Sequence, residues 1–281
     1  MSQVSSVTVI SAERHERFFQ MLKDLWAYRE LFVSFFERDL KVRYKQTALG
    51  AVWVVLQPLF LSGAYSIILG KLAGMPTDGL PPVLFYFAAN VPWTGFSREI
   101  TGAAMSVEGN ANLVTKIYFP RIIVPAAFVC SSMVDFLVGW TILAIAAISL
   151  GYWHWSLVAI TPLLMLIQGA IGLGIGAILA ALNAQYRDVK NVIGFLVQLM
   201  MLATPVFYPI STLAEKVSPH AAALVLTLNP MAVVIVTYRD CLRGLALNWS
   251  LIGIALVSSL LVLFVGVWFF RKRETHFADV L

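Results

Sequence analysis

The chain has 281 residues, of which 59% are hydrophobic and only 12% are charged, with a formal net charge of +5. Soluble domains average about 25% charged residues, so this composition excludes an ordinary soluble globular protein. The sequence therefore predicts an all-α integral membrane protein without a separate soluble domain. Cys130 and Cys241 match no metal or redox spacing, and we expect them to pack.

Residues 1–46 are predicted to form a cytoplasmic N-terminal region with an amphipathic helix over 17–45. The residues on its apolar face are Phe18, Leu22, Leu25, Phe32, Phe36 and Leu40. The residues on its polar face are Gln20, Lys23, Glu30, Ser34, Arg38 and Lys41. Pairs Glu37/Lys41 and Asp39/Arg43 at i,i+4 favour this helix. It is predicted to lie in the membrane interface, either as a basic collar that binds anionic lipid or as a docking surface for a partner.

Residues 47–281 are predicted to form a transmembrane domain of six helices, since a spanning helix needs about 20 apolar residues. The predicted spans are 47–70, 83–107, 122–150, 157–183, 191–209 and 250–270. Residues 136–186 carry no charge and are too long for one crossing. The "GYWHW" stretch at 151–155 supplies a turn at the interface level, where Trp and Tyr rings settle.

The segment 221–238 is long and apolar enough to span, but Asn229-Pro230 interrupts it. Six crossings place sixteen of the twenty basic residues on one side, with Arg98 counted in the second loop. By the positive-inside bias this side is cytoplasmic, together with both termini and the tail 271–281. We therefore predict that 211–245 is a broken, re-entrant hairpin on the outer side, before the last helix.

Three ordered stretches carry a resemblance to a known family. They read "RDLKVRYKQTALGAVWVVLQPL" at 38–59, "NANLVTKIYFPRIIVP" at 110–125 and "YRDVKNVIGFLVQLMMLATPVFYP" at 186–209. The chain resembles the permease subunits of bacterial ABC exporters for cell-surface polysaccharides such as O-antigen, capsule and teichoic acid. The resemblance extends over nearly the whole chain, to "FADVL" at 277–281.

This resemblance implies a homodimer in the bacterial inner membrane with two copies of a cytoplasmic ATP-binding subunit. The complex would move an undecaprenyl-linked glycan outward, and no nucleic acid is expected as a partner. The chain lacks a G-x-x-x-x-G-K-[ST] phosphate loop, so ATP and Mg²⁺ are expected on the partner subunit. We accordingly expect no enzymatic activity, cofactor or metal site in this chain.

The resemblance also implies that the loop 108–121 couples the permease to the ATPase, and without it the loop reads as a plain cytoplasmic turn. The candidate coupling residues are Glu108, Asn110, Asn112, Lys116, Arg121, Arg187 and Asp188. For Arg187 and Asp188 a structural ion pair is an equal alternative.

A phosphate head on the substrate needs cationic donors at the cytoplasmic mouth, and a sugar chain needs flat aromatic faces along its path. The candidate cations are Arg38, Lys41, Arg43 and Lys45. The candidate rings are Trp53, Phe60, Tyr65, Tyr86, Trp93, Phe207 and Tyr208, with Phe85 and Phe96 also available. Asp135 lies about 20 Å of helix rise beyond Ile122. It is either functional or a hydrogen-bonded packing residue.

Other readings stay open. An ABC exporter for a drug or small lipid would share the six-helix plan. A glycan-modifying membrane enzyme would want paired acids, whereas only Asp135 is placed deep in the membrane. A secondary transporter would show repeated helix breaks in both halves, but Pro205, Pro209 and Pro230 cluster in the second half. The sequence specifies neither the glycan nor how its chain end is recognised or whether export is processive.

Overall fold

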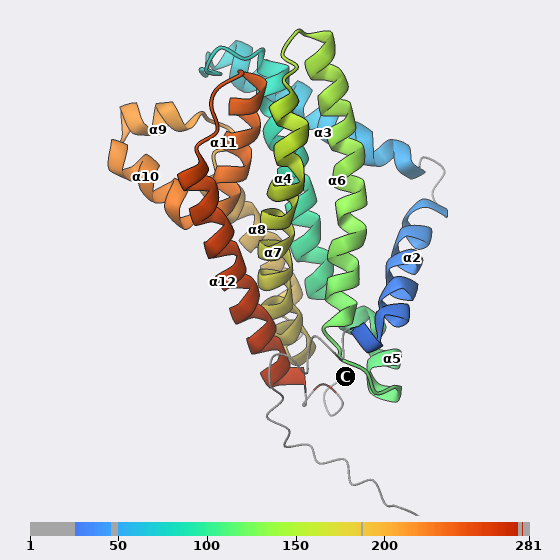
Figure 1. Cartoon of the computed structure of the whole chain (residues 1–281). Coiled ribbons are helices and arrows are strands. Elements are labelled where there is room, and N and C mark those ends of the chain that lie inside the picture. The colour runs from blue at the N-terminus through green and yellow to red at the C-terminus, as the bar shows by residue number, and fades with distance from the viewer. Residues whose placement is uncertain (1–25, 46–49, 187, 275–276, 278–281) are drawn as a thin grey trace, which may run out of the picture.

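The computed structural model describes residues 26–45, 50–186, 188–274 and 277, and within these ranges every regular element is a helix. The helices run mostly side by side in a bundle (Figure 1). In chain order they are α2 (Arg29–Lys45), α3 (Gly50–Tyr65), η1 (Ser66–Leu72), α4 (Pro82–Ser106), η2 (Glu108–Asn110), α5 (Ala111–Lys116), α6 (Ile123–Ser149), α7 (Trp155–Gln185), α8 (Val189–Ala203), α9 (Ile210–Lys216), α10 (Pro219–Leu228), α11 (Pro230–Leu242) and α12 (Trp249–Glu274).

Four predicted spans coincide closely with single helices, namely α4, α6, α7 and α12. Among the described helices, α6, α7 and α12 are each long and apolar enough to cross a membrane, and α10 with α11 together pass the same test as a bent pair. Helix α4 has 25 residues but includes Arg98 and Glu99 in its second half. The all-helical membrane architecture is therefore confirmed, whereas the count of six crossings stays a prediction.

The first and fifth predicted spans differ in detail from the helices observed. The first is α3 followed without a break by the π-helical turn η1. The fifth ends at Ala203, because Thr204 adopts an extended conformation before Pro205 and the next residues leave the helix. The predicted span 191–209 was thus too long, and residues 204–209 form an irregular segment instead.

The segment 211–245 contains three helices and a sharp bend. Asn229 ends α10 and caps α11 by accepting a hydrogen bond from the amide of Ala232 at 3.3 Å. The axes of α10 and α11 differ by 106° at this point. Ser211 donates to Asp78 at 2.8 Å, and Arg243 lies 3.9 Å from the same carboxylate. Both ends of the segment therefore lie beside the connection between η1 and α4, and the re-entrant path stays a prediction.

Helix α4 lies at the centre of the bundle, against α3, α6, α7 and α11. Its Phe85, Tyr86 and Phe87 are fully buried in the main apolar core. Helices α7 and α12 approach closely at a pair of glycines, since a Cβ on Gly266 would overlap the backbone of Gly174. Small residues at a helix crossing are typical of membrane bundles, where close packing replaces the hydrophobic effect.

Helix α2 packs along the first turns of α6, and part of its predicted orientation is wrong. Residues 17–25 of the predicted helix lie outside the described ranges. Phe35, which the apolar face did not include, is buried against Phe119 with ring centroids 6.0 Å apart. Arg38, predicted on the outer polar face, is half-buried and donates to Asn110 at 2.5 Å. The hydrogen bonds of Arg38 inside the protein thus outweigh the outward orientation that the hydrophobic pattern of α2 predicts.

One of the two predicted i,i+4 pairs forms. Lys41 lies 2.7 Å from Glu37 on the exposed side of α2. Asp39 instead pairs with its neighbour Arg38 at 2.7 Å, which leaves Arg43 to a different acid. That acid is the centre of the candidate site.

Candidate functional site

Asp135 of α6 joins three helices in one buried charged cluster. Its carboxylate accepts a hydrogen bond from Arg98 of α4 at 2.6 Å, and from Arg43 and Tyr44 at the end of α2. Only 3% of the Asp135 side chain is exposed. The sequence suggested either a functional or a hydrogen-bonded role for this residue, and the structure shows that it is hydrogen-bonded.

Two arginines share this one carboxylate, so the cluster of Arg43, Arg98 and Asp135 carries one excess positive charge. Arg98 was counted in a loop, and this was wrong, because it lies within α4 two turns before the helix ends. Its side chain is 32% exposed, compared with 19% for Arg43. Among the described residues, its hydrogen-bond and ion-pair partner is Asp135. The remaining guanidinium N–H groups of Arg98 are therefore available to a ligand.

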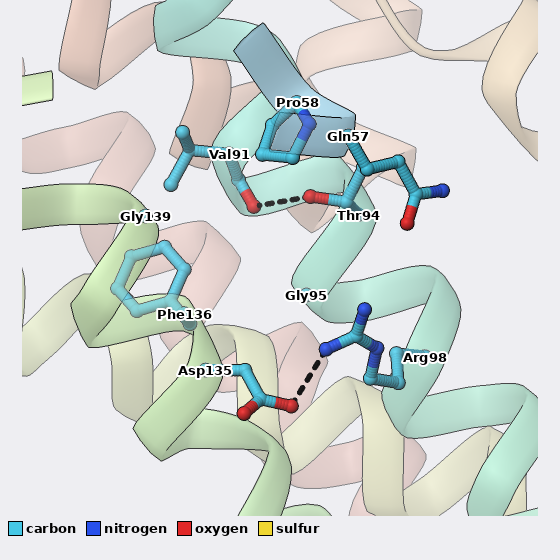
Figure 2. Close-up of a pocket in the computed structure, with 9 residues that line it drawn as sticks. All are labelled: Gln57, Pro58, Val91, Thr94, Gly95, Arg98, Asp135, Phe136 and Gly139. Carbon is cyan, nitrogen blue, oxygen red and sulfur yellow. Dashed lines mark hydrogen bonds and ion pairs between the residues drawn. The ribbon is translucent and has the colours of Figure 1, made fainter. Parts of the chain in front are cut away.

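A small pocket opens beside the cluster between α3, α4 and α6. Figure 2 shows Arg98 and Asp135 pointing toward one another from α4 and α6, with Gln57 and Thr94 further along the pocket. Gly95 and Gly139 line it without side chains. The volume of the pocket that water can occupy is about 20 Å³, which is enough for one or two ordered waters. The pocket thus gives Arg98 contact with water and not a complete binding cavity.

The other predicted cations of α2 lie outside this cluster. Arg38 stacks over the Phe35 ring at 4.7 Å and bonds to Asp39 and Asn110. Lys41 and Lys45 are exposed. Of the four candidates, the structure brings only Arg43 to Asp135.

Three of the predicted path rings gather near the irregular segment 204–209. Tyr65 lies edge-on to Phe207 with centroids 5.0 Å apart, and 6.1 Å from the ring of Tyr86. Tyr86 is fully buried, and its hydroxyl has no hydrogen-bond partner among the described residues. The group therefore combines partly accessible rings with one enclosed hydroxyl.

The remaining candidate rings are dispersed. Trp93 is buried beside Phe96, and Phe85 is buried under a guanidinium. Phe60 is 69% exposed, and Tyr208 is half-buried. Trp53 belongs to α3, but its side chain lies outside those described.

The predicted coupling residues divide into two groups. Glu108 accepts from Asn183 of α7 at 2.8 Å, Asn110 contacts Arg38, and Arg121 donates to the backbone carbonyl of Glu274. These three hold the loop to the bundle. The exposed side chains are Asn112, Leu113, Thr115, Lys116, Ile117 and Tyr118, which we call the α5 surface. Asp188 is exposed at the start of α8, and Arg187 lies outside the described residues.

Tyr118 is the most prominent apolar group of the α5 surface. Its side chain is 83% exposed, and Ile117 beside it is 53% exposed. The buried Val114 and Phe119 anchor this stretch from the other side. Sequence reasoning selected the polar residues of the loop and missed these two, although exposed aromatic and aliphatic groups mark interaction sites.

A second buried acid, Glu99 of α4, was also missed. Its Oε1 accepts from Gln168 of α7 at 2.9 Å, and its Oε2 has no hydrogen-bond partner among the described residues. The tight fit depends on Gly172, where a Cβ would lie 2.5 Å from Oε2. The statement that only Asp135 lies deep is thus wrong. The two acids have different hydrogen-bond partners, Gln168 for Glu99 and Arg98 for Asp135.

Arg239 of α11 is a buried cation that holds the irregular segment after α8. It donates to the carbonyls of Pro205 at 2.6 Å, Val206 at 2.8 Å and Tyr208 at 3.3 Å, and its guanidinium lies 3.5 Å from the Phe85 ring centroid. The irregular backbone leaves these carbonyls without helical partners, and the guanidinium supplies donors. The sequence placed Arg239 within the predicted outer hairpin 211–245 and gave no sign of this role.

Comparison with known proteins agrees with this architecture. The family model described as ABC-2 type transporter matches residues 30–243. The chain is 29% identical over 262 residues to the O-antigen export system permease protein RfbA of Myxococcus xanthus, covering 92% of this chain and 98% of the relative. Two RfbA proteins of Klebsiella pneumoniae are each 28% identical, over 90% of this chain and 95% of their own length. On the extent of the family match and on its helical membrane architecture, this chain belongs to the ABC-2 type transporter family.

Proposed function

We propose that this protein is the membrane-spanning permease subunit of an ATP-driven exporter that moves a lipid-linked, O-antigen-like polysaccharide across the bacterial inner membrane. The observation that carries the proposal is the family match together with relatives that are named O-antigen export permeases and align along nearly their full length. An exporter of drugs or small lipids has no comparable support among these relatives.

We infer that the working unit contains two copies of this chain and two copies of a cytoplasmic ATP-binding subunit, which carries ATP and Mg²⁺. Helix α2, the α5 surface and the end of α12 lie at one end of the bundle (Figure 1). These parts carry nine of the chain's twenty basic residues, namely five in α2, Lys116 and three at the end of α12, which supports a cytoplasmic position for this end and for both termini. The bent α10–α11 pair then enters and leaves from the outer side.

The α5 surface is the proposed docking site for the ATP-binding subunit. Tyr118 and Ile117 offer an apolar anchor, Lys116 adds a cation, and buried residues behind them hold the loop in place. Aromatic anchors surrounded by polar residues carry most of the binding free energy in protein interfaces. Arg121 and Asn110 are not part of this proposed docking site, because their side chains bond to other residues of the permease.

We assign recognition of the substrate's phosphate head to Arg98, supported by Arg43. The excess positive charge near Asp135 is costly in an apolar environment, so an anion that reaches Arg98 is stabilised there. The sugar chain would then pass the rings of Tyr65 and Phe207, whose faces contact apolar C–H groups without strong directional bonds. We propose no contact with the substrate for Arg38, which bonds to Asn110, or for Lys41, which pairs with Glu37.

The proposal is tested in cells in which the chromosomal gene is deleted and plasmid copies are compared. The native gene should restore surface polysaccharide, whereas Tyr118→Ala should not. We expect loss of the anchor to weaken ATPase binding by about 2 kcal/mol, or roughly thirtyfold in Kd. Co-purification of the ATPase measures this loss.

Trp155→Ala is the matched control, because this exposed ring lies at the opposite end of the bundle. It should leave both ATPase binding and surface polysaccharide at the native level. Normal surface polysaccharide in the deletion strain itself would show that the protein exports something else.

A further inference from the structure

Phe277, three residues beyond the end of α12, packs against the loop 108–121. Phe277 is fully buried, with its ring edge-on to Phe270 at 5.3 Å. The guanidinium of Arg121 lies 5.8 Å over the Phe277 ring and donates to the carbonyl of Glu274, the last residue of α12. Arg121 therefore contacts both the end of α12 and Phe277.

These contacts have a clear physical basis. The last carbonyls of a helix lack helical partners and carry partial negative charge, so a guanidinium placed there is favourable. A buried aromatic ring adds a cation–π contact to the same guanidinium. Phe277 also belongs to one apolar cluster with Val114 and Phe119 of the coupling loop. The loop thus rests on α12 through an apolar cluster and a helix cap.

The contacts continue from α12 into the centre of the bundle. Arg273 donates to Gln185, the last residue of α7, at 2.7 Å. Further along, α12 and α7 meet at Gly266 and Gly174 with no room for a side chain. A continuous set of contacts thus joins the loop 108–121 to α12, and α12 to α7.

We propose that Phe277 is a positioning residue that, through Arg121, fixes the α5 surface relative to α12. The contact itself is a property of this chain, whereas its use in coupling rests on the proposed function. Without Phe277 the loop keeps its exposed docking residues but loses its fixed distance from α12. The ATPase then meets a mobile surface, which it must order on binding.

The direct test is a spin-label distance measurement on the purified permease in lipid nanodiscs. Labels are placed at Lys116→Cys on α5 and Lys272→Cys on α12, in a background without the native cysteines and diluted with unlabelled protein. The native permease should give one narrow distance. Phe277→Ala should lose it in favour of a broad distribution, and Phe277→Leu, which restores part of the buried volume, should lie between them.

Phe264→Ala serves as the matched control, because this ring is on α12 but 59% exposed. It should keep the narrow distance. In a second arm, the ATPase subunit should bind Phe277→Ala roughly tenfold more weakly than the native permease. Arg121→Ala should weaken binding to a similar degree, and the double variant should be no weaker than either single variant, since both act through one contact.

A narrow distance in Phe277→Ala would overturn the proposal, and so would additive losses in the double variant. If Phe277→Ala cannot be purified, the distribution for Phe277→Leu decides in the same way. Should the distances behave as expected while the native permease binds no ATPase, the positioning contact stands and the proposed function fails.

Discussion

Replacement of Asp135 by alanine is expected to be among the most damaging single substitutions in this protein. The change leaves Arg43 and Arg98 side by side without their shared carboxylate and removes the acceptor of Tyr44. Breaking a buried ion pair from one side typically costs about 3–5 kcal/mol. Because Arg98 is 32% exposed and water screens part of its charge, we expect a loss of about 3 kcal/mol.

Thermal unfolding of the purified protein in nanodiscs measures this loss, and Asp135→Glu should recover part of it by restoring the charge. Glu37→Ala is the matched control, since it removes a carboxylate from an exposed i,i+4 pair with Lys41. Its effect should stay within about 0.5 kcal/mol. Native-like stability of Asp135→Ala would show that the cluster contributes nothing to holding α2 on α4 and α6.

The second large effect is expected at Arg239. Arg239→Leu keeps an apolar body in α11 but leaves the carbonyls of Pro205, Val206 and Tyr208 without their donor. Each buried acceptor without a partner costs about 1–3 kcal/mol, so we expect a loss of at least about 3 kcal/mol. The rings of Tyr65 and Phe207 should then separate, because the segment that carries Phe207 is no longer fixed.

A second substitution at Arg239 separates the effect of its charge from that of its geometry, and a substitution at Arg243 serves as the control. Arg239→Lys keeps the charge, but its ammonium has three donors and no planar fork, so it should restore only part of the stability. Arg243→Gln is the control, because its two ion pairs are long, at 3.9 and 3.8 Å, and partly exposed. If Arg239→Leu unfolds no earlier than Arg243→Gln, the carbonyl contacts carry no net stability.

Hydropathy and proline placement predicted most of the bundle correctly. The bounds of α4, α6, α7 and α12 follow from largely apolar runs of spanning length, and Asn229-Pro230 marks the sharp bend. The end of α8 was missed, although Pro205 restricts Thr204 to an extended conformation and so signals the helix boundary. The restriction that Pro205 places on the backbone of Thr204 thus ended the helix, although the apolar pattern continues.

The site was less predictable because its charges are satisfied by residues distant in sequence. Charge counting treated Arg98 as a loop residue and gave Arg239 no partner, yet each is inside a helix with partners that only the folded chain brings near. Arg98 of α4 donates to Asp135 of α6. Arg239 donates to an irregular segment that lies more than thirty residues earlier in the sequence. The exposure of Tyr118 did not follow from the sequence pattern, because Ile117 and Tyr118 are exposed in succession while the neighbouring Phe119 is buried.

The most direct measurement of the central claim is transport in a purified system. The permease and its ATPase are reconstituted in vesicles with a lipid-linked polysaccharide placed on the ATP-accessible side. The account predicts that ATP makes the glycan accessible to an impermeant glycosidase on the opposite side, and that Arg98→Gln slows this more than Arg98→Lys. Steady ATP hydrolysis without any glycan crossing, or equal transport of a short lipid that carries no glycan, would contradict it.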